Sequence, residues 1–312
     1  MHRGDGGGII KRSDNFLGID IGGTNVRLGV VTPDSTLENA EIFSTKQIAG
    51  ADAADRLLDV IYQYKKNLPY DVDAIAMGFP STINRDRTVV LSTPNIEGFD
   101  NLDIIDQFEE KLQVPVLIEK DTCMLMHYDL DRHDISDGIL IGYYIGTGLG
   151  NIILIDGKVI VGKDGVAGEL GHIPILDRHD KCGCGLEGCS ELYVAGLGLE
   201  RLQRERFSET PIAKIFTVQG QTEEIRYFIE SMAKIIVTEI NILNPDYIIL
   251  GGGVIGMTDF PYDLLIDYIH QFTRKPLPGD SLNIIRSDFS NPYNGVIGAG
   301  LFARKQLEGA GK

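Results

Sequence analysis

The sequence lacks long hydrophobic runs and has little positive charge. No apolar segment approaches the ~20 residues that a membrane-spanning helix needs, and the opening residues MHRGDGGGIIKRSDN lack the apolar centre of a signal peptide. The 312 residues carry a formal net charge of −16. This charge excludes nucleic acid and anionic membranes as partners, because both require a basic face. An anionic small substrate would therefore need help from Mg²⁺ or from backbone amides.

Cysteine is also scarce, and its placement is informative. Three of the four cysteines, Cys182, Cys184 and Cys189, fall within eight residues, between glycines, and the first follows His172 by ten residues. A Cys₃His set is typical of Zn²⁺, and four protein ligands would close the shell and make the metal structural. Ordinary loop thiols are the alternative. Cys123 lies in the apolar run CMLM and is expected to be buried. Thiols gathered as ligands, and not spaced as disulfides, indicate the reducing cytoplasm.

The chain is long enough for two domains, and its composition of 43% hydrophobic and 24% charged residues is that of a globular protein. Residues 1–15 are Gly-rich and polar, and we expect them to be disordered. FLGIDIGGTNVRLGVV predicts two strands joined by a tight turn, and GILIGYYIGTGLGNIILIDGKVI repeats the pattern. This duplication predicts a two-lobed α/β fold with its site in an interdomain cleft.

Periodicity predicts the other elements. Apolar residues at helical spacing predict helices over 53–65, 102–112 and 222–243, the last stopped by Pro245, and unbroken apolar runs predict buried strands in DAIAMGFP, PVLIEKD, DYIILGGGV and LNIIRS. We place the crossing between domains in the loop after Asp121. The predicted domains are 16–122 and 123–312, with the last helix packing back on the first.

Three glycine turns follow apolar strands. They are Asp20-Ile-Gly-Gly-Thr-Asn, Gly146-Thr-Gly and Gly251-Gly-Gly. Their backbone amides can approach phosphate oxygens, and the hydroxyls of Thr24 and Thr147 can add donors. A turn without a ligand is the more common explanation for any single one of them, but their matched placement in both halves favours a nucleotide.

Of two other nucleotide motifs, one is excluded and one is disfavoured. There is no GxxxxGK[ST], and therefore no P-loop. Gly251-x-Gly253-x-x-Gly256 has the letters of a dinucleotide fingerprint, but MTDFPYD follows it where a helix should start.

These motifs resemble those of ROK-family sugar kinases, within the actin-like, hexokinase-type ATPase superfamily. IDIGGTNVR, GVAGELGHI and CGCGLEGCSE carry the resemblance, which covers Phe16 to Arg304. GFPSTI, LSTPNI, VAGELGHIPI and TRKPLP look closest to D-allose kinases, although N-acetylmannosamine kinases, glucokinases and fructokinases share the general motifs. Family repressors carry an N-terminal winged helix-turn-helix, and we expect none here because the first predicted strand starts near residue 16.

The resemblance implies a homodimeric kinase with ATP and Mg²⁺ as co-substrates, acting on the 6-hydroxyl of a hexose, first of all D-allose. N-acetylmannosamine kinase, glucokinase and a sugar-sensing regulator are the alternatives. The implied phosphate contacts are Gly22, Gly23, Thr24, Asn25, Gly146, Thr147 and Gly148, and the implied nucleoside contacts are Gly251, Gly252 and Gly253. Asp121 is implied as the catalytic base, and the implied sugar contacts are Asn95, Asp121, Glu169, His172 and Glu191.

Each carboxylate has a second interpretation. Asp121 ends an apolar strand, which would hold a base rigidly, but it could equally cap the next helix. Asp20 could orient Mg²⁺ through water or bond the backbone of its own turn.

Lys120 stands where many sugar kinases of this group have Asn. An ammonium only donates hydrogen bonds, so that sugar contact is altered, which favours a hexose with different hydroxyl stereochemistry from glucose, such as D-allose.

His172 can serve both metal and sugar. Glu169 and His172 form Glu-x-x-His, which di-iron bundles also use, but the second copy that a bundle needs is missing. We expect zinc to take one ring nitrogen while the other faces a sugar hydroxyl, with Glu191 positioned by the same segment. A zinc-knuckle module for nucleic acid is excluded because nothing basic or aromatic surrounds the cluster.

Overall fold

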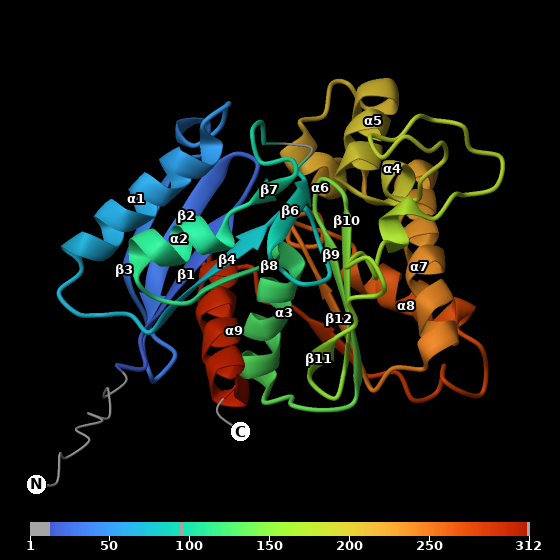
Figure 1. The fold of residues 1–312 in the computed structure, drawn as a ribbon. Helices are drawn as coiled ribbons and strands as arrows, with labels where there is room; N and C mark the ends of the chain where they lie inside the picture. The colour runs from blue at the N-terminus through green and yellow to red at the C-terminus, as the bar shows by residue number, and fades with distance from the viewer. Residues whose placement is uncertain (1–12, 94–95, 311–312) are drawn as a thin grey trace, which may run out of the picture. The chain divides into compact units, whose positions relative to one another are not determined.

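The computed structural model describes residues 13–93 and 96–310, and these divide into two compact units (Figure 1). The first unit holds residues up to Ser81, Arg87–Met124 and the segment from Gly295 onward, and the second holds Thr82–Asp86 and Leu125–Asn294. Asn95 and residues 1–12 of the segment predicted to be disordered lie outside the described residues. Ser13, which belongs to the same predicted segment, donates hydrogen bonds to Asp71 and Asp73.

The first unit is built on a five-stranded sheet in the order β3-β2-β1-β4-β8. β1 and β2 form the antiparallel hairpin predicted from the first glycine turn, and β1, β4 and β8 run parallel. Almost every residue of β1 and β4 is buried, as is typical of parallel strands covered on both faces. The strands are β1 Phe16–Ile21, β2 Asn25–Val31, β3 Leu37–Ser44, β4 Ala74–Phe79 and β8 Val116–Lys120.

The second unit repeats this topology, which confirms the predicted duplication. Its sheet has the order β11-β10-β9-β12-β13, with an antiparallel β9–β10 hairpin followed by parallel β12 and β13. The strands are β9 Ile139–Ile145, β10 Leu149–Ile155, β11 Lys158–Val159, β12 Tyr247–Gly251 and β13 Ile284–Arg286. Three short strands lie outside the two sheets: β5 Thr82–Ile83, β6 Val89–Ser92 and β7 Leu102–Asp103.

The helices follow the predicted periodicity, with one difference. The helix expected over 102–112 starts only at Ile105, because Leu102 pairs with Val90 in β6 and β7. The helices are α1 Ala53–Asn67, α2 Ile105–Leu112, α3 Asp121–His133, α4 Glu191–Val194, α5 Gly196–Arg206, α6 Ile215–Gln219, α7 Glu223–Leu243, α8 Tyr262–Phe272 and α9 Asn294–Ala310. Single 3₁₀ turns are η1 Thr45–Gln47, η2 Leu170–His172 and η3 Ile212–Lys214.

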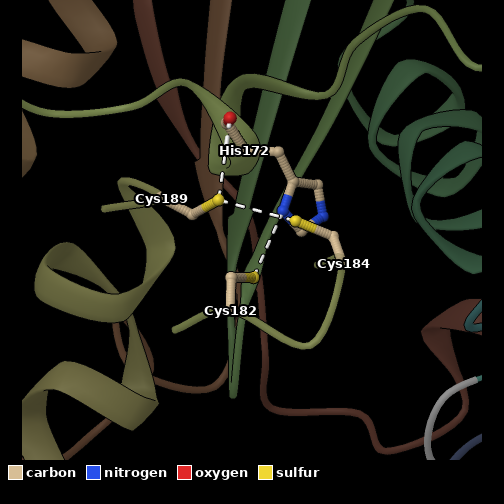
Figure 2. A group of neighbouring side chains, drawn as sticks. All are labelled: His172, Cys182, Cys184 and Cys189. Carbon is tan, nitrogen blue, oxygen red and sulfur yellow. Dashed lines mark hydrogen bonds between the residues drawn. The ribbon is translucent and has the colours of Figure 1, made fainter. Parts of the chain in front are cut away.

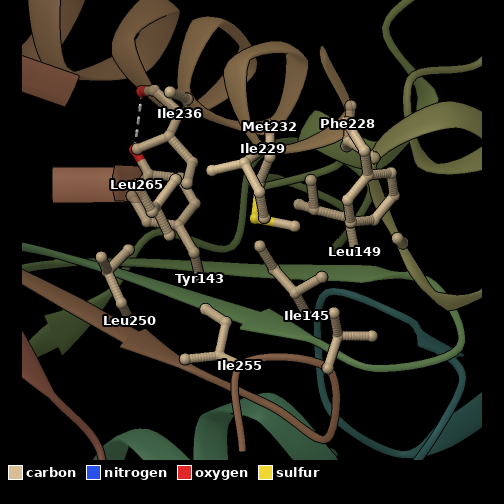
Figure 3. Close-up of a cluster of buried hydrophobic side chains, with 14 of the residues drawn as sticks. Tyr143, Ile145, Leu149, Phe228, Ile229, Met232, Ile236, Leu250, Ile255 and Leu265 are labelled. Atoms are coloured by element: carbon tan, nitrogen blue, oxygen red, sulfur yellow. Dashed lines mark hydrogen bonds between the residues drawn. The ribbon is translucent and has the colours of Figure 1, made fainter. Parts of the chain in front are cut away.

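Helix α7 organises the core of the second unit. It begins after Thr222, whose side chain accepts the amide of Ile225, and ends at Asn244 in the left-handed conformation, one residue before Pro245. Its buried face packs over the sheet, where Phe228, Ile229 and Met232 meet Ile145, Leu149 and Leu250 (Figure 3). This core fixes the ends of β9 and β12, from which two of the glycine turns emerge.

Helix α9 packs on the sheet of the first unit. Phe16 and Ala76 form a buried cluster with Ala299 and Phe302. The approach is close enough that a Cβ on Gly18 would lie 2.0 Å from the backbone oxygen of Val296. The last helix of the chain therefore belongs to the first unit.

The predicted crossing point between the domains is wrong in one respect. We expected a loop after Asp121, but α3 starts at Asp121 itself, and the two compact units divide between Met124 and Leu125, inside this helix. Lys120 is the last residue of the strand and Asp121 the first of the helix, so no linker separates them. Within the described part of the chain, no helix combines the length and apolar character needed to span a bilayer.

Candidate active site

Two carboxylates lie at one edge of the first sheet. β1, β4 and β8 are parallel, so their carboxyl ends meet at the same edge. In β4, Gly78 pairs with Asp20 on one side and with Glu119 on the other, and Asp121 follows two residues after Glu119. A Cβ on Gly78 would lie 3.3 Å from the Cα of Asp121. It would also lie 2.9 Å from Cγ of Met124, so glycine at position 78 lets the start of α3 pack closely against β4.

The environment of these carboxylates suits proton transfer. Burial, assisted by the charge of Asp20, raises the pKa of Asp121 to about 7. Burial also raises the pKa of Asp20 to about 6, although Arg27, 3.8 Å away, acts in the opposite direction. A Cβ on Gly295, at the start of α9, would lie 2.7 Å from the Cγ of Asp20. A carboxylate with a pKa near 7 is a good general base at neutral pH.

Asp121 differs from an ordinary helix cap. Its Oδ1 accepts the amide of the next residue, Thr122, at 2.7 Å, whereas a cap residue usually reaches the second or third amide of the helix. The preceding Lys120 is buried at 8% exposure, and its amide donates to Glu119, which forms an ion pair with Arg87 at 2.7 Å. Asp121 is thus held at the junction of a buried strand and a helix.

Several backbone groups of the first glycine turn already have hydrogen-bond partners within the protein. The amide of Gly22 donates to the oxygen of Asn25 at 2.9 Å, and Thr45 binds the turn twice, through its hydroxyl to Gly22 and through its amide to Thr24. Gly23 and Thr24 form the exposed tip. The tip, and not Gly22, is the part of this turn that is open to a ligand.

The second glycine turn is anchored to the start of α5. The amide of Gly146 donates to the oxygen of Gly148 at 3.0 Å. The carbonyls of Gly146 and Thr147 accept the amides of Gly196 and Leu197 at 2.8 and 3.0 Å. Thr147 is exposed at the tip. These bonds turn the carbonyls inward and fix the conformation of the tip.

In the third glycine turn, two glycines are buried and the third is exposed. Gly252 has a φ of +97°, and a Cβ there would lie 2.2 Å from the amide nitrogen of Ile145. Gly251 is buried against Phe289, whereas Gly253 is exposed with open space around it. Bends and turns, and no helix, follow until α8, as expected from the sequence, so the helix of a dinucleotide fingerprint is missing here.

The four predicted metal ligands converge (Figure 2). His172, Cys182, Cys184 and Cys189 each offer one ligand atom, and these atoms lie within 4.8 Å of one another. The sulfur of Cys182 is 3.6 Å from Nδ1 of His172, and the sulfurs of Cys184 and Cys189 are 3.6 Å apart. Ligand atoms of a tetrahedral zinc shell are separated by about 3.5–3.8 Å, so this set fits zinc. We call residues 172–189 the knot.

Short backbone contacts shape the knot. The amide of Cys182 donates to the oxygen of Leu186 at 2.8 Å, and Pro174 forms an isolated bridge with Cys189. Gly188 has a φ of +73°, and a Cβ there would lie 2.4 Å from the oxygen of Arg178. Glycine is required at this crossing of the chain. Cys123 is fully buried in α3 and is not among the converging residues, as predicted.

Two predicted sugar contacts flank the histidine ring. Oε1 of Glu191 is 3.6 Å from Nδ1 of His172 and 3.3 Å from the sulfur of Cys182, and Oε2 of Glu169 is 3.7 Å from Nε2. A Cβ on Gly148 would lie 2.5 Å from Oε2 of Glu191. Glu191 therefore lies between the knot and the second glycine turn, and the second unit brings these groups together.

Comparison with known proteins identifies the family. A sequence profile of the ROK family matches residues 16–306. The chain belongs to the ROK family. An N-acetyl-D-glucosamine kinase of Mannheimia succiniciproducens is 31% identical over 289 residues, which cover 84% of this chain and 89% of that protein.

Solved structures share the fold of this ROK protein. A ROK family glucokinase from Streptomyces griseus, in complex with glucose and AMPPNP, has a TM-score of 0.74 at 24% identity, covering 93% of this chain and 99% of that one. A ROK family transcriptional regulator, a homolog of the E. coli MLC protein, has a TM-score of 0.79 at 22% identity, covering 94% and 78%. The predicted two-lobed, hexokinase-type α/β fold is confirmed.

Some residues that shape the site of this ROK protein escaped sequence reasoning. Gly148 and Gly295 leave room for the side chains of Glu191 and Asp20, and Gly78 lets the start of α3 approach β4. Their only signal in the sequence is a glycine at a strand end or a helix start, which many unrelated turns share. The contacts that need these glycines become visible only in three dimensions.

Proposed function

We propose that this ROK protein is an ATP-dependent hexose kinase that transfers the γ-phosphate to the 6-hydroxyl. The observation that carries the proposal is Asp121, a carboxylate with a pKa near 7 at the carboxyl edge of a parallel sheet. The kinase names of its relatives support the same reaction. Proton uptake by Asp121 would accompany attack of the sugar oxygen on the γ-phosphorus, with ADP leaving.

Positioning of the two substrates supplies the rest of the mechanism. The exposed turn tips at Gly23, Thr24 and Thr147 offer amides and hydroxyls to phosphate oxygens. Asp20 is the carboxylate that would orient Mg²⁺ through water, and the bound ion would neutralise charge on the phosphates. A kinase of this type needs little covalent chemistry, so these contacts and the base account for the catalysis.

Glu169, His172 and Glu191 form the proposed sugar site in the second unit. Their contacts leave Nδ1 of His172 facing the cysteine sulfurs and Nε2 facing Glu169. Zinc bound by the knot would fix the imidazole through Nδ1, which orients Nε2 toward a sugar hydroxyl. With four protein ligands the metal would hold sugar-binding groups in place and would take no part in phosphoryl transfer.

We propose D-allose as the preferred sugar. Buried Lys120 beside Asp121 and the motifs shared with D-allose kinases support this choice. N-acetylglucosamine is a second candidate, because the relative with 31% identity is an N-acetyl-D-glucosamine kinase. N-acetylmannosamine and glucose are the remaining sugars to be tested.

ADP release from Mg-ATP with each of these sugars, compared as kcat/KM, tests the proposal. Highest kcat/KM for D-allose is the expected result. Preference for N-acetylglucosamine would support the proposed reaction but refute D-allose as the preferred substrate. A folded, zinc-loaded protein that releases no ADP with any sugar, yet binds one, would instead be a sugar-sensing regulator.

We also propose a homodimer that works in the reducing cytoplasm. Leu176 is 90% exposed in the knot, and Leu186, Tyr227 and Ile242 are more than half exposed on the same unit. Association through this unit would remove such apolar side chains from water. None of the four cysteines forms a disulfide, which fits a reducing compartment. Light scattering should give twice the chain mass of 34.3 kDa. A monomer at micromolar concentration would refute the dimer.

A further inference from the structure

Three side chains join the knot to the helices that follow it. The Oδ2 atom of Asp180, in the knot, accepts the hydroxyl of Tyr193 at 2.5 Å and Nη1 of Arg201 at 2.9 Å. The hydroxyl of Tyr193 also accepts the amide of Asp180 at 3.3 Å. Tyr193 belongs to α4 and Arg201 to α5. We call Asp180, Tyr193 and Arg201 the clamp.

Two guanidinium groups hold the ring of Tyr193. Arg201 lies 4.8 Å from the ring centroid, and Arg178, from the knot, lies 5.1 Å from it. Both distances are within the range of cation–π attraction. Arg201 further donates through Nη2 to the carbonyl of Leu192 at 3.2 Å. Arg201 therefore contacts both the backbone of α4, at Leu192, and the side chain of Tyr193.

The clamp connects the same two elements as the proposed sugar site. Asp180 precedes Cys182 by two residues, and its carbonyl accepts the amide of Gly188 at 2.9 Å, inside the knot. Tyr193 follows Glu191 by two residues in α4. Glu191 contacts Cys182 while Tyr193 contacts Asp180. Two residues of α4, Glu191 and Tyr193, thus contact the knot.

Two residues, one before the short helix α4 and one within it, anchor this helix to the knot. Before it comes Cys189, a proposed metal ligand, and within it Tyr193 is bound to Asp180. One anchor would fix the position of Glu191 but not the direction of the four-residue helix that carries it, whereas two anchors fix both. A site that is loose by about 1 Å loses much of its function, so the second anchor matters for sugar binding.

Packing holds Tyr193 only in part, because its side chain packs against the core of the second unit but also borders open space. Tyr193 and Arg201 border a cavity of about 330 Å³, whose far wall is formed by α7 with Tyr227 and Phe228. Tyr193 therefore has open space beside it. Without its bond to Asp180, the ring would have room to move.

We propose that Asp180, Tyr193 and Arg201 are positioning residues that set sugar affinity by fixing Glu191 and His172. This inference rests on the proposed function, because it takes these two residues as sugar contacts. The clamp includes none of the proposed substrate contacts, so it should affect sugar binding and leave phosphoryl transfer nearly unchanged.

Tyr193→Phe is the direct test, because it removes the hydroxyl and keeps the ring. Calorimetry should show a dissociation constant for the sugar that is about three- to tenfold higher, with KM raised equally and kcat within about twofold of the parent. Zinc content, measured by metal analysis, should remain one per chain. Tyr227→Phe is the matched control, because its hydroxyl lies on the same cavity and accepts Nη2 of Arg178 at 3.4 Å. It should leave sugar affinity unchanged.

A double-mutant cycle separates a shared bond from general loosening. The effects of Asp180→Asn and Tyr193→Phe on sugar affinity should be non-additive. The double variant should lose no more affinity than the single variant that loses more. Arg201→Lys should retain more affinity than Arg201→Gln. Unchanged affinity in zinc-loaded Tyr193→Phe, or an equal loss in Tyr227→Phe, would overturn the clamp. Loss of zinc from Tyr193→Phe would also overturn it, because the residue would then act on the metal. If the parent protein binds no hexose, the proposed function fails first.

Discussion

Replacing Asp121 by Asn should make the protein slower and, above neutral pH, more stable. The pKa of this carboxyl rises from 3.8 to about 7, chiefly through burial and secondarily through the charge of Asp20. The ionised form is therefore disfavoured in the folded protein. Catalysis by a general base needs that ionised form, so function and stability oppose each other at this residue.

The magnitude follows from the pKa. Each tenfold change in proton affinity corresponds to about 1.4 kcal/mol, so ionised Asp121 costs the folded protein about 4 kcal/mol above pH 7. The native protein binds this proton more tightly than the unfolded chain. Stability is therefore lost as the pH rises from about 4 to about 7, and the cost vanishes below that window. Asn carries no charge and should recover about 2–4 kcal/mol at pH 8, or about 4–8 °C in Tm.

Two assays on one variant test this reasoning. At pH 8, Asp121→Asn should show a higher Tm than the parent, and at pH 4 the two should agree, while kcat should fall by about 10²–10⁴. A helix cap would behave in the opposite way, because its loss costs about 1 kcal/mol of stability and leaves chemistry intact. A variant that is less stable at pH 8 and keeps most of its kcat would show that Asp121 is a cap.

Three further perturbations have defined outcomes. The kcat/KM of the parent should fall below about pH 7, and Asp20→Asn should move this limb to lower pH, because losing a neighbouring negative charge lowers the pKa of Asp121; an unmoved limb would argue against their coupling. Cys189→Ser should abolish zinc binding, lower Tm and weaken sugar binding by about tenfold or more, as metal analysis and calorimetry would show; a zinc-free variant with full sugar affinity would contradict the role of the knot. Gly18→Ala should destabilise the first unit by about 3 kcal/mol or more in denaturant unfolding, because its Cβ would lie 2.0 Å from the oxygen of Val296; an unchanged midpoint would refute this close packing.

Local patterns predicted much of the fold. The two strand–turn–strand hairpins and the long helix ended by Asn244 and Pro245 follow from periodicity and turn chemistry. The convergence of His172 with three cysteines follows from spacing alone, because the whole knot is one short segment rich in glycine. Such features depend on residues that are near one another in the sequence.

Contacts between distant segments could not be predicted in this way. Gly295 approaches Asp20 from the far end of the chain, and Asp20 and Asp121 share an edge because β4 inserts between β1 and β8. The order of strands in a sheet depends on crossover connections, which hydrophobic patterning does not encode. The direct passage of β8 into α3 could not be predicted for a related reason, since Asp is favoured both in turns and at the start of helices.

The position of the transferred phosphate tests the central claim most directly. The protein, Mg-ATP and the sugar with the highest kcat/KM should be incubated to completion, and the product analysed by phosphorus and proton NMR beside ADP measurement, with Asp121→Asn as the control. We predict one ADP for each hexose 6-phosphate and almost no product from the variant. ADP without phosphorylated sugar, phosphate on another hydroxyl, or equal product from Asp121→Asn would contradict the account.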